Sequence, residues 1–288
     1  MTESIGVIEK LESQWSQEKF LCVGVDPVIA EGSFGQGEDA LYIASADIIK
    51  ATKNVAAAYK PNSAFFEREE RGLETLALVT EYIRTEAPDV PIIWDSKRGD
   101  IGNTNSGYND ALERIGADAI TLSPYLGGTA LQPLLSNPER MGIVLVKTSN
   151  PDSGEFQDLE LVEGGKLWER VAFDVANDSD KWHHGSPLGI VVGATYPETI
   201  ARARKIVGDD VTILVPGVGT QGGDLEASVR GAANSRRSGF LINVSSGISQ
   251  PKDSKGEKIP TPSVTNMREA AENFDMKIKS AKLKVQWS

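Results

Sequence analysis

Eight short apolar segments, each followed by a stretch of helical character, are the feature that most limits how this chain can fold. The segments are rich in β-branched residues and nearly continuous in apolar character, as in parallel strands covered on both faces. They are Phe20–Val25, Val55–Tyr59, Pro91–Trp94, Ala119–Leu122, Gly142–Val146, Leu188–Val192, Val211–Val215 and Phe240–Val244. Such an alternation of strands and helices predicts an α/β protein with a parallel sheet.

The stretches that follow the strands carry apolar residues at the spacing of one helix face. Examples are residues 72–87, 103–117 and 197–208. Eight β/α units are the number that a TIM barrel requires, whereas a doubly wound open sheet needs a glycine-rich phosphate turn after its first strand. The chain has GVDPVIAEG at that place, and no linker divides its 288 residues. We therefore expect a single domain, residues 1–288, folded as a TIM (β/α)8 barrel.

The charge balance and the cysteine content limit the partners and the compartment. Asp and Glu number 41 against 30 Lys and Arg, so a surface that coats nucleic acid is not expected, and an anionic ligand needs a local pocket. No apolar run approaches the roughly 20 residues of a membrane span, and the first residues lack the regions of a signal peptide. The single cysteine, Cys22, cannot form an internal disulfide and is expected in the core. We expect a cytoplasmic protein without membrane or nucleic-acid partners.

Charged residues at the ends of the first three strands are unusual, because burying an unpaired charge is costly. They are Asp26, Lys60 and Asp95, with Lys97 and Asp100 shortly after the third strand. The alternative for each residue alone is a salt bridge that seals the barrel mouth. Together they predict an alternating array of Lys and Asp, because neighbouring strand ends converge in a barrel. Two stretches, 149–160 and 249–263, are expected to be long mobile loops on this face.

The segment WDSKRGDIGNT resembles the D-x-K-x-x-D signature of the orotidine 5′-phosphate decarboxylase family, with Asp95, Lys97 and Asp100 at the signature positions. The same triad occurs in two related groups, the ketogulonate-phosphate decarboxylases and the hexulose-phosphate synthases, so it identifies only the superfamily. The segments VGVDP, YKPNSAFFE, VKTSNP and PGVGTQGGD resemble the nucleotide decarboxylase in type and order. The resemblance covers nearly the whole chain and is strongest to the longer-loop bacterial branch of the family.

This resemblance implies decarboxylation of orotidine 5′-monophosphate to uridine 5′-monophosphate in pyrimidine biosynthesis, with neither cofactor nor metal. It places Lys97 beside the carbanion-like centre as its proton donor and Asp95 near the departing carboxylate. Lys60 and Asp100 complete the charge network. In the family the last Asp crosses a two-fold interface, so Asp100 and Ile101 imply a homodimer.

The resemblance also assigns substrate contacts to residues in several loops. Asp26 and Lys60 bind ribose hydroxyls, Ser149 reads the amide edge of the pyrimidine, and Thr104 adds a ribose contact across the interface. Ile101 is also assigned to the residues that contact the substrate. The phosphate is assigned to the glycine-rich turn after the seventh strand and to the segment after the eighth. The residues concerned are Pro216, Gln221, Ser246 and Gly247.

One position departs from the family pattern. After the eighth strand the family carries arginine in N-x-S-R-G/A-I, whereas this chain has Ser246. A hydroxyl cannot make the bidentate, charge-assisted contact that a guanidinium makes with phosphate. Arg236 and Arg237 precede this strand and are expected at the opposite end of the barrel. Three interpretations remain: a weakened natural enzyme, an engineered Arg→Ser change, or a homologue with an altered substrate.

Two other functions remain open from the sequence. One is a metal-dependent sugar-phosphate decarboxylase or aldolase of the same superfamily, and the other is a catalytically weak barrel that binds nucleotides. The adjacent His183 and His184 lack the spacing of a metal site, and we assign them no role. The complete set of Lys60, Asp95, Lys97 and Asp100 argues against a mere binding module, which has no need of a matched charge array.

Overall fold

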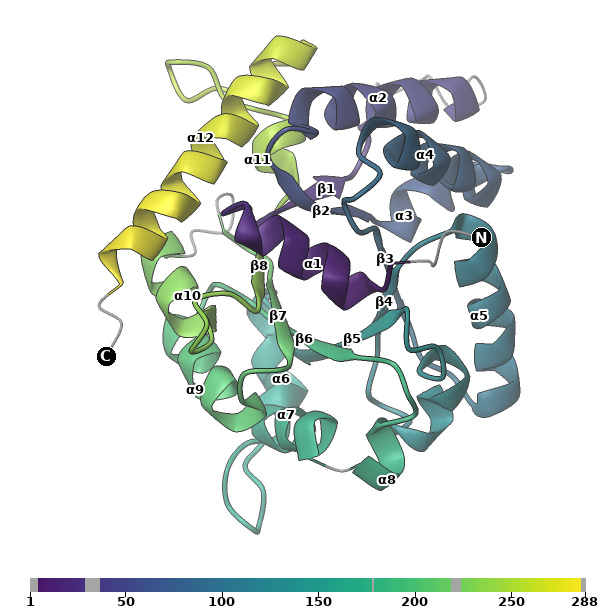
Figure 1. Cartoon of the computed structure of the whole chain (residues 1–288), viewed down its shortest axis with the longest axis vertical. Coiled ribbons are helices and arrows are strands. Elements are labelled where there is room, and N and C mark those ends of the chain that lie inside the picture. The colour runs from purple at the N-terminus through teal and green to yellow at the C-terminus, as the bar shows by residue number, and fades with distance from the viewer. Residues whose placement is uncertain (1–4, 29–36, 178, 219–223, 286–288) are drawn as a thin grey trace.

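Eight parallel strands form one sheet that closes on itself. The computed structural model describes residues 5–28, 37–177, 179–218 and 224–285. The strands are β1 (Leu21–Val25), β2 (Ala56–Pro61), β3 (Ile93–Arg98), β4 (Ala119–Leu122), β5 (Met141–Lys147), β6 (Leu188–Val192), β7 (Thr212–Val215) and β8 (Phe240–Val244). Their order is β2-β1-β8-β7-β6-β5-β4-β3, and the parallel bridges Tyr59 to Ile92 and Asn62 to Asp95 join β2 to β3. The predicted TIM barrel is confirmed (Figure 1).

Helices surround the barrel, and one covers its end. The longer ones are α1 (Val7–Ser16), α2 (Gly37–Thr52), α4 (Gly72–Glu86), α5 (Gly102–Ile115), α7 (Leu167–Asn177), α9 (Pro197–Val207), α10 (Leu225–Ala232) and α12 (Val264–Lys284). The short ones are α3 (Ser63–Phe66), η1 (Thr129–Leu134), η2 (Pro151–Ser153), α6 (Gly154–Gln157), α8 (Ser179–Trp182) and α11 (Ser246–Ser249). Helix α1 lies across the end of the barrel that faces the viewer in Figure 1. Within the described ranges, no helix combines the length and apolar character that a membrane span requires.

The sequence pattern placed three of these helices correctly. Helices α4, α5 and α9 begin within one residue of the predicted stretches and end one or two residues earlier. Gly116 explains one of these ends, because it has φ 72°, a left-handed conformation that glycine adopts without strain at a helix C-terminus. The strand predictions hold as well, but β2 and β3 extend further than expected and include Lys60, Asp95 and Lys97.

The interior of the barrel and its outer surface carry separate apolar cores. The interior core contains Cys22, Ile93 and Leu241 from the strands together with Val7 and Leu11 from α1, which therefore plugs this end. The outer core lies between the strands and the surrounding helices. Cys22 is fully buried, as predicted, and burial raises its pKa to about 12. Its thiol is therefore un-ionised at neutral pH.

Two arginines at the end of the barrel covered by α1, one buried and one exposed, donate to backbone carbonyls. The Arg204 guanidinium donates to the carbonyls of Ala232, Gly208, Val211 and Gly239, and burial lowers its pKa to about 10. Arg236 donates to the Asp209 carbonyl and pairs with Asp210, directly before β7. These contacts confirm that Arg236 lies at the opposite end of the barrel from Ser246.

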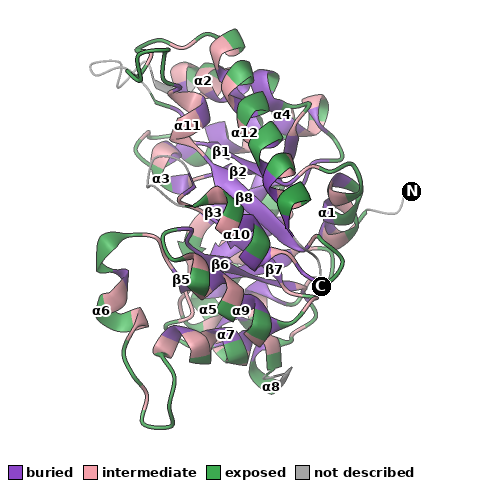
Figure 2. Cartoon of the chain, turned by 90° about the vertical axis from the view of Figure 1, so that its left-hand side faces the viewer, coloured by how far each residue is buried: buried purple, intermediate pink, exposed green. Residues whose placement is uncertain are grey.

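Parts of the two stretches that were expected to be long mobile loops carry secondary structure. Residues 149–160 include η2 and α6, and the second stretch, 249–263, contains a bridge between Lys252 and Lys258. In Figure 2 the β5–α7 connection with α6 projects to the left, on the side of the barrel away from α1. This side is the mouth of the barrel, where the strands end.

Candidate active site

Strand geometry directs a set of polar side chains into the barrel mouth. Side chains of a strand alternate between its two faces. Counting in steps of two from the interior residues Cys22, Ala58, Ile93 and Ala119 therefore leads to Asp26, Lys60, Asp95 and Thr121. The neighbouring strands bring these ends together, as the bridge from Asn62 to Asp95 shows.

An ion array occupies the ends of β2 and β3. Lys60 Nζ lies 2.6 Å from Asp95 Oδ2, and Lys97 Nζ lies 2.6 Å from Asp95 Oδ1. Lys60 and Asp95 are only 5% and 7% exposed, whereas the Lys97 side chain is 49% exposed. The structure thus brings together three of the predicted residues, with one lysine buried and the other open to a ligand.

The charges of this array stabilise one another. Burial alone would raise the pKa of Asp95, but the Lys60 and Lys97 ammonium groups outweigh it and hold the pKa well below the usual range. Burial likewise disfavours the charged form of Lys60, but the Asp95 and Asp26 carboxylates together raise its pKa. For Asp26, burial dominates and raises the pKa, against the lowering effects of Lys60 and the Ser245 hydroxyl. Its Oδ1 atom is buried and has no hydrogen-bond partner among the described residues.

Thr121 belongs to this site, and the sequence reasoning missed it. Its hydroxyl donates to Asp95 Oδ1 at 3.0 Å and accepts from the Lys97 backbone amide at 2.9 Å. Lys97 has φ 48°, a left-handed conformation that is uncommon for lysine, and the pairing of β3 with β4 shifts register between Trp94 and Arg98. Thr121 therefore holds both the carboxylate and the irregular backbone of Lys97. The only available signal was a threonine at an inward position of an apolar strand.

Asp100, Ile101 and Thr104 lie beside the array but point elsewhere. The Asp100 carboxylate accepts from the Ile101 amide at 2.7 Å, and the contacts found for it in the described part of the chain include no ion pair with Lys97. Ile101 is 62% exposed, and Thr104 on the first turn of α5 is exposed. Within one chain, Ile101 and Thr104 are therefore exposed, and the half-buried Asp100 is bound locally rather than to Lys97.

Ser149 lies on the other side of the mouth, directly after β5. It is half-buried, and a Cβ at Gly193 would lie only 2.8 Å from its Cα, so the end of β6 must be glycine at this close approach. Lys147, two residues earlier, is almost fully buried and pairs with Asp158. This lysine belongs to the motif VKTSNP, in which only Ser149 was assigned a role from the sequence.

The residues assigned to phosphate lie at the ends of β7 and β8. Pro216 follows β7 and is half-buried, while Gln221 lies outside the described residues. Ser246 is the first residue of α11, and Gly247 packs so closely that a Cβ would lie 3.0 Å from the Phe274 ring. The half-buried Ser246 therefore places a neutral hydroxyl group just after the end of β8.

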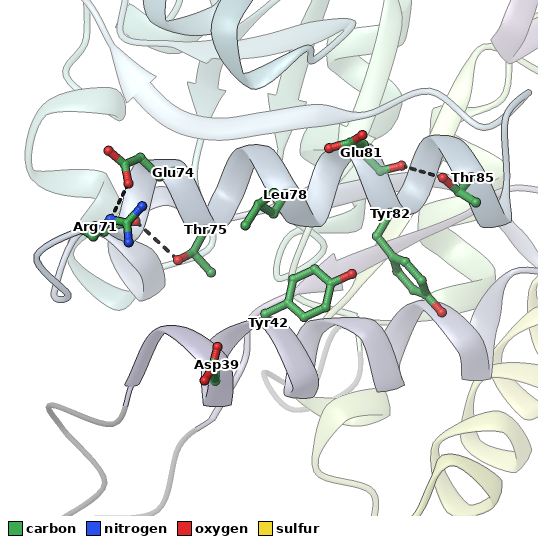
Figure 3. Close-up of a pocket in the computed structure, with 9 residues that line it drawn as sticks. All are labelled: Asp39, Tyr42, Arg71, Glu74, Thr75, Leu78, Glu81, Tyr82 and Thr85. Carbon is green, nitrogen blue, oxygen red and sulfur yellow. Dashed lines mark hydrogen bonds and ion pairs between the residues drawn. The ribbon is translucent and has the colours of Figure 1, made fainter.

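A separate pocket of about 470 Å³ lies between α2 and α4, on the outside of the barrel (Figure 3). The rings of Tyr42 and Tyr82 and the carboxylates of Asp39, Glu74 and Glu81 contribute to its lining. None of the predicted site residues lines it, so its chemistry is unrelated to the mouth.

His183 and His184 contact the carbonyls of Val175 and Lys181 as ordinary turn residues do.

Comparisons with known proteins agree with this geometry. A model of the orotidine 5′-phosphate decarboxylase / HUMPS family matches residues 19–258. The chain is 41% identical over 245 residues to the orotidine 5′-phosphate decarboxylase of Janthinobacterium sp. (strain Marseille), covering 84% of this chain and 88% of that protein. It is 42% identical over 249 residues to the enzyme of that name from Bordetella pertussis, with the same coverage.

Solved structures give the same result. The Leishmania donovani OMP decarboxylase structure superposes with a TM-score of 0.81 at 30% identity, covering 98% of this chain and 100% of that one. The Leishmania donovani UMP synthase structure gives a TM-score of 0.84 at 32% identity, covering 98% of this chain and 57% of that one. The matched family model, the sequence identities and the shared fold show that the chain belongs to the orotidine 5′-phosphate decarboxylase / HUMPS family.

Proposed function

We propose that this protein decarboxylates orotidine 5′-monophosphate to uridine 5′-monophosphate, a step of pyrimidine biosynthesis, in the cytoplasm. The observation that carries the proposal is the Lys60–Asp95–Lys97 array at the barrel mouth, with one ammonium buried and the other exposed to a ligand. Relatives of about 40% identity that bear the name of this enzyme support it.

The array supplies what this reaction needs. Breaking the bond to the carboxylate releases carbon dioxide and leaves the electron pair on the ring carbon, where a fixed ammonium stabilises it. In this mechanism Lys97 then donates its proton to that carbon, and Asp95 lies near the departing carboxylate. Lys60 and Asp26 bind ribose hydroxyls. Thr121 holds the Asp95 carboxylate and the Lys97 backbone in position through its hydroxyl. No step requires an electron acceptor.

The direct test is loss of orotidine 5′-monophosphate absorbance in the presence of excess chelator. Turnover that is insensitive to the chelator supports the proposal. Turnover only of a sugar phosphate, and only with added Mg²⁺, supports the second candidate, a metal-dependent sugar-phosphate enzyme. That candidate remains open because the matched family model also covers such enzymes.

We further propose a homodimer in which Asp100 completes the partner's site, with Ile101 and Thr104 contacting the ligand there. The exposure of Ile101 and Thr104 and the local bonding of Asp100 support this arrangement. A chain that supplied Asp100 only to its own array would be expected to hold it near Lys97.

Mixing two inactive variants tests the shared site. Lys97→Ala and Asp100→Ala proteins, exchanged under mild denaturant, should recover about a quarter of wild-type activity, because half the dimers are mixed and one of their two sites is intact. Each variant alone is the control. Continued inactivity of a mixture shown to contain mixed dimers would mean that Asp100 acts within its own chain.

Restoring the family arginine should improve binding of the phosphate. Ser246→Arg is expected to lower the KM for orotidine 5′-monophosphate about 10- to 100-fold, the range of a new charge-assisted contact. It should leave the KM for unphosphorylated orotidine unchanged. Ser254→Arg, in the exposed 249–263 loop, controls for the added charge. An unchanged KM in Ser246→Arg would favour a homologue with an altered substrate.

A further inference from the structure

The connection from β5 to α7 leaves the barrel and soon returns to the place where it left. Lys147 is the last residue of β5, and Asp158 follows α6 eleven positions later. Lys147 Nζ lies 2.7 Å from Asp158 Oδ2. Residues 148–157 therefore form a compact loop whose ends meet, and this ion pair, the neck pair, closes it.

The two partners of the neck pair differ in burial. The Lys147 side chain is 3% exposed and its ammonium lies 5.7 Å from the centre of the Tyr196 ring, whereas Asp158 is partly exposed and also lies 3.5 Å from Lys166. The bond from Lys147 holds the pKa of Asp158 below its usual range, so the carboxylate is charged at neutral pH. A buried ammonium is costly without a counter-charge, and Asp158 supplies that charge.

Further bonds join the two stems of the loop beside the neck pair. The Thr148 amide donates to Gln157 Oε1 at 2.9 Å, and Gln157 Nε2 donates to Thr148 Oγ1 at 2.9 Å. Thr148 Oγ1 also contacts Asn150 Oδ1 at 2.6 Å. Thr148 is therefore bound by Gln157, the residue before Asp158. Asn150, on the other side of Ser149, is bound by Thr148.

The end of β6 holds Ser149 from the other side. The Gly193 amide donates to the Lys147 carbonyl at 2.8 Å, and Thr195 Oγ1 donates to the Ser149 carbonyl at 3.3 Å. Since only a hydrogen fits at Gly193, the Ser149 backbone lies directly against β6. Ser149 is therefore held between the end of β6 on one side and the stems of the loop on the other.

We infer that the neck pair Lys147–Asp158 is a positioning device that fixes Ser149 for recognition of the pyrimidine base. This inference rests on the proposed function, in which Ser149 reads the amide edge of that base. Lys147 and Asp158 act through Ser149 and are positioning residues, not catalytic ones. Their effect is on the base and not on the ribose phosphate, which other strands bind.

Three variants test the inference: Lys147→Met, Asp158→Asn and, as a matched control, Lys166→Met. The readouts are the inhibition constants of uridine 5′-monophosphate and of ribose 5-phosphate, which lacks the base. In Asp158→Asn the constant for uridine 5′-monophosphate should rise about 10- to 100-fold, as expected when a contacting group is misplaced by about 1 Å. The constant for ribose 5-phosphate should change less than about twofold.

The two neck variants should differ in size of effect. Asp158→Asn leaves a buried charge unpaired and should weaken base recognition more than Lys147→Met, which leaves Asp158 with Lys166 and solvent. The double variant should resemble Lys147→Met, because the two groups act as one pair. Lys166→Met should match wild type in both constants.

Several results would overturn the inference. Equal weakening of both ligands would indicate a general loss of structure, and unchanged constants in both neck variants would show that Ser149 is held without the pair. Loss of turnover in a folded Lys147→Met protein that still binds uridine 5′-monophosphate normally would place Lys147 in the chemistry. Failure of the proposed function is distinct, because then wild-type protein itself neither turns over orotidine 5′-monophosphate nor prefers the nucleotide to ribose 5-phosphate.

Discussion

Replacing Lys97 by alanine is expected to lower kcat for orotidine 5′-monophosphate by a factor of at least about 10⁴. The change removes both the charge that stabilises the carbanion-like centre and the proton donor, and each effect alone contributes about 10²- to 10⁴-fold. Lys97 is the exposed ammonium of the array, so its removal leaves the Lys60–Asp95 pair in place. Single-turnover loss of substrate absorbance, with chelator present, measures the effect.

A lysine of equal exposure provides the control for this prediction. The Lys50 side chain is 51% exposed, against 49% for Lys97, and it lies on the outer helix α2. Lys50→Ala should keep wild-type kcat, and Lys97→Ala should keep a normal unfolding midpoint. A Lys97→Ala protein that retained more than about a tenth of wild-type kcat would show that another group delivers the proton.

Replacing Asp95 by asparagine should destabilise the protein by about 3–5 kcal/mol, the usual result when one partner of a buried ion pair is removed. Lys60 then stays buried beside a neutral amide. The single amide oxygen cannot accept both from Lys60 and from the side of Thr121 and Lys97, so at least one of these contacts is lost. Urea unfolding followed by circular dichroism measures the loss, and activity should disappear as well.

Two variants show whether this loss comes from the buried pair. Asp174→Asn breaks an exposed i,i+4 pair with Arg170 on α7 and should cost less than about 1 kcal/mol. Lys60→Met combined with Asp95→Asn should cost less than Asp95→Asn alone, because no buried ammonium is left unpaired. If the double variant were less stable by the sum of the single losses, the two groups would not be coupled.

The pH dependence of stability has a defined sign for Asp95. Its pKa in the folded protein lies below the value of about 3.9 expected in the unfolded chain. Its contribution is therefore complete above about pH 4 and is lost as the pH falls from there toward the folded pKa. Asp26, whose pKa is raised, acts in the opposite direction and loses its contribution as the pH rises through the aspartate range. The acid loss of stability should thus be shallower in Asp95→Asn than in wild type.

The site could be predicted only as far as local patterns extend. Strand ends indicated that Lys60, Asp95 and Lys97 meet, and the structure confirms it. The role of Thr121 was invisible, because its bonds depend on the register shift between β3 and β4 and on the left-handed backbone of Lys97. Lys147 was missed for a related reason: its burial depends on a loop that returns to it eleven residues later.

The order of strands and helices, the barrel class and the charges at the strand ends could all be inferred from the sequence, because periodicity and strand-end chemistry are local properties of the chain. The folded structure was needed to show which of those charges pair, which lysine is buried and that Asp100 is bound locally rather than to Lys97. Pairing depends on distances of a few ångströms between strands that are far apart in sequence. The burial of a lysine depends on which loop covers the end of its strand. Neither the pairing nor the burial of a charge can be inferred from a single segment of the sequence.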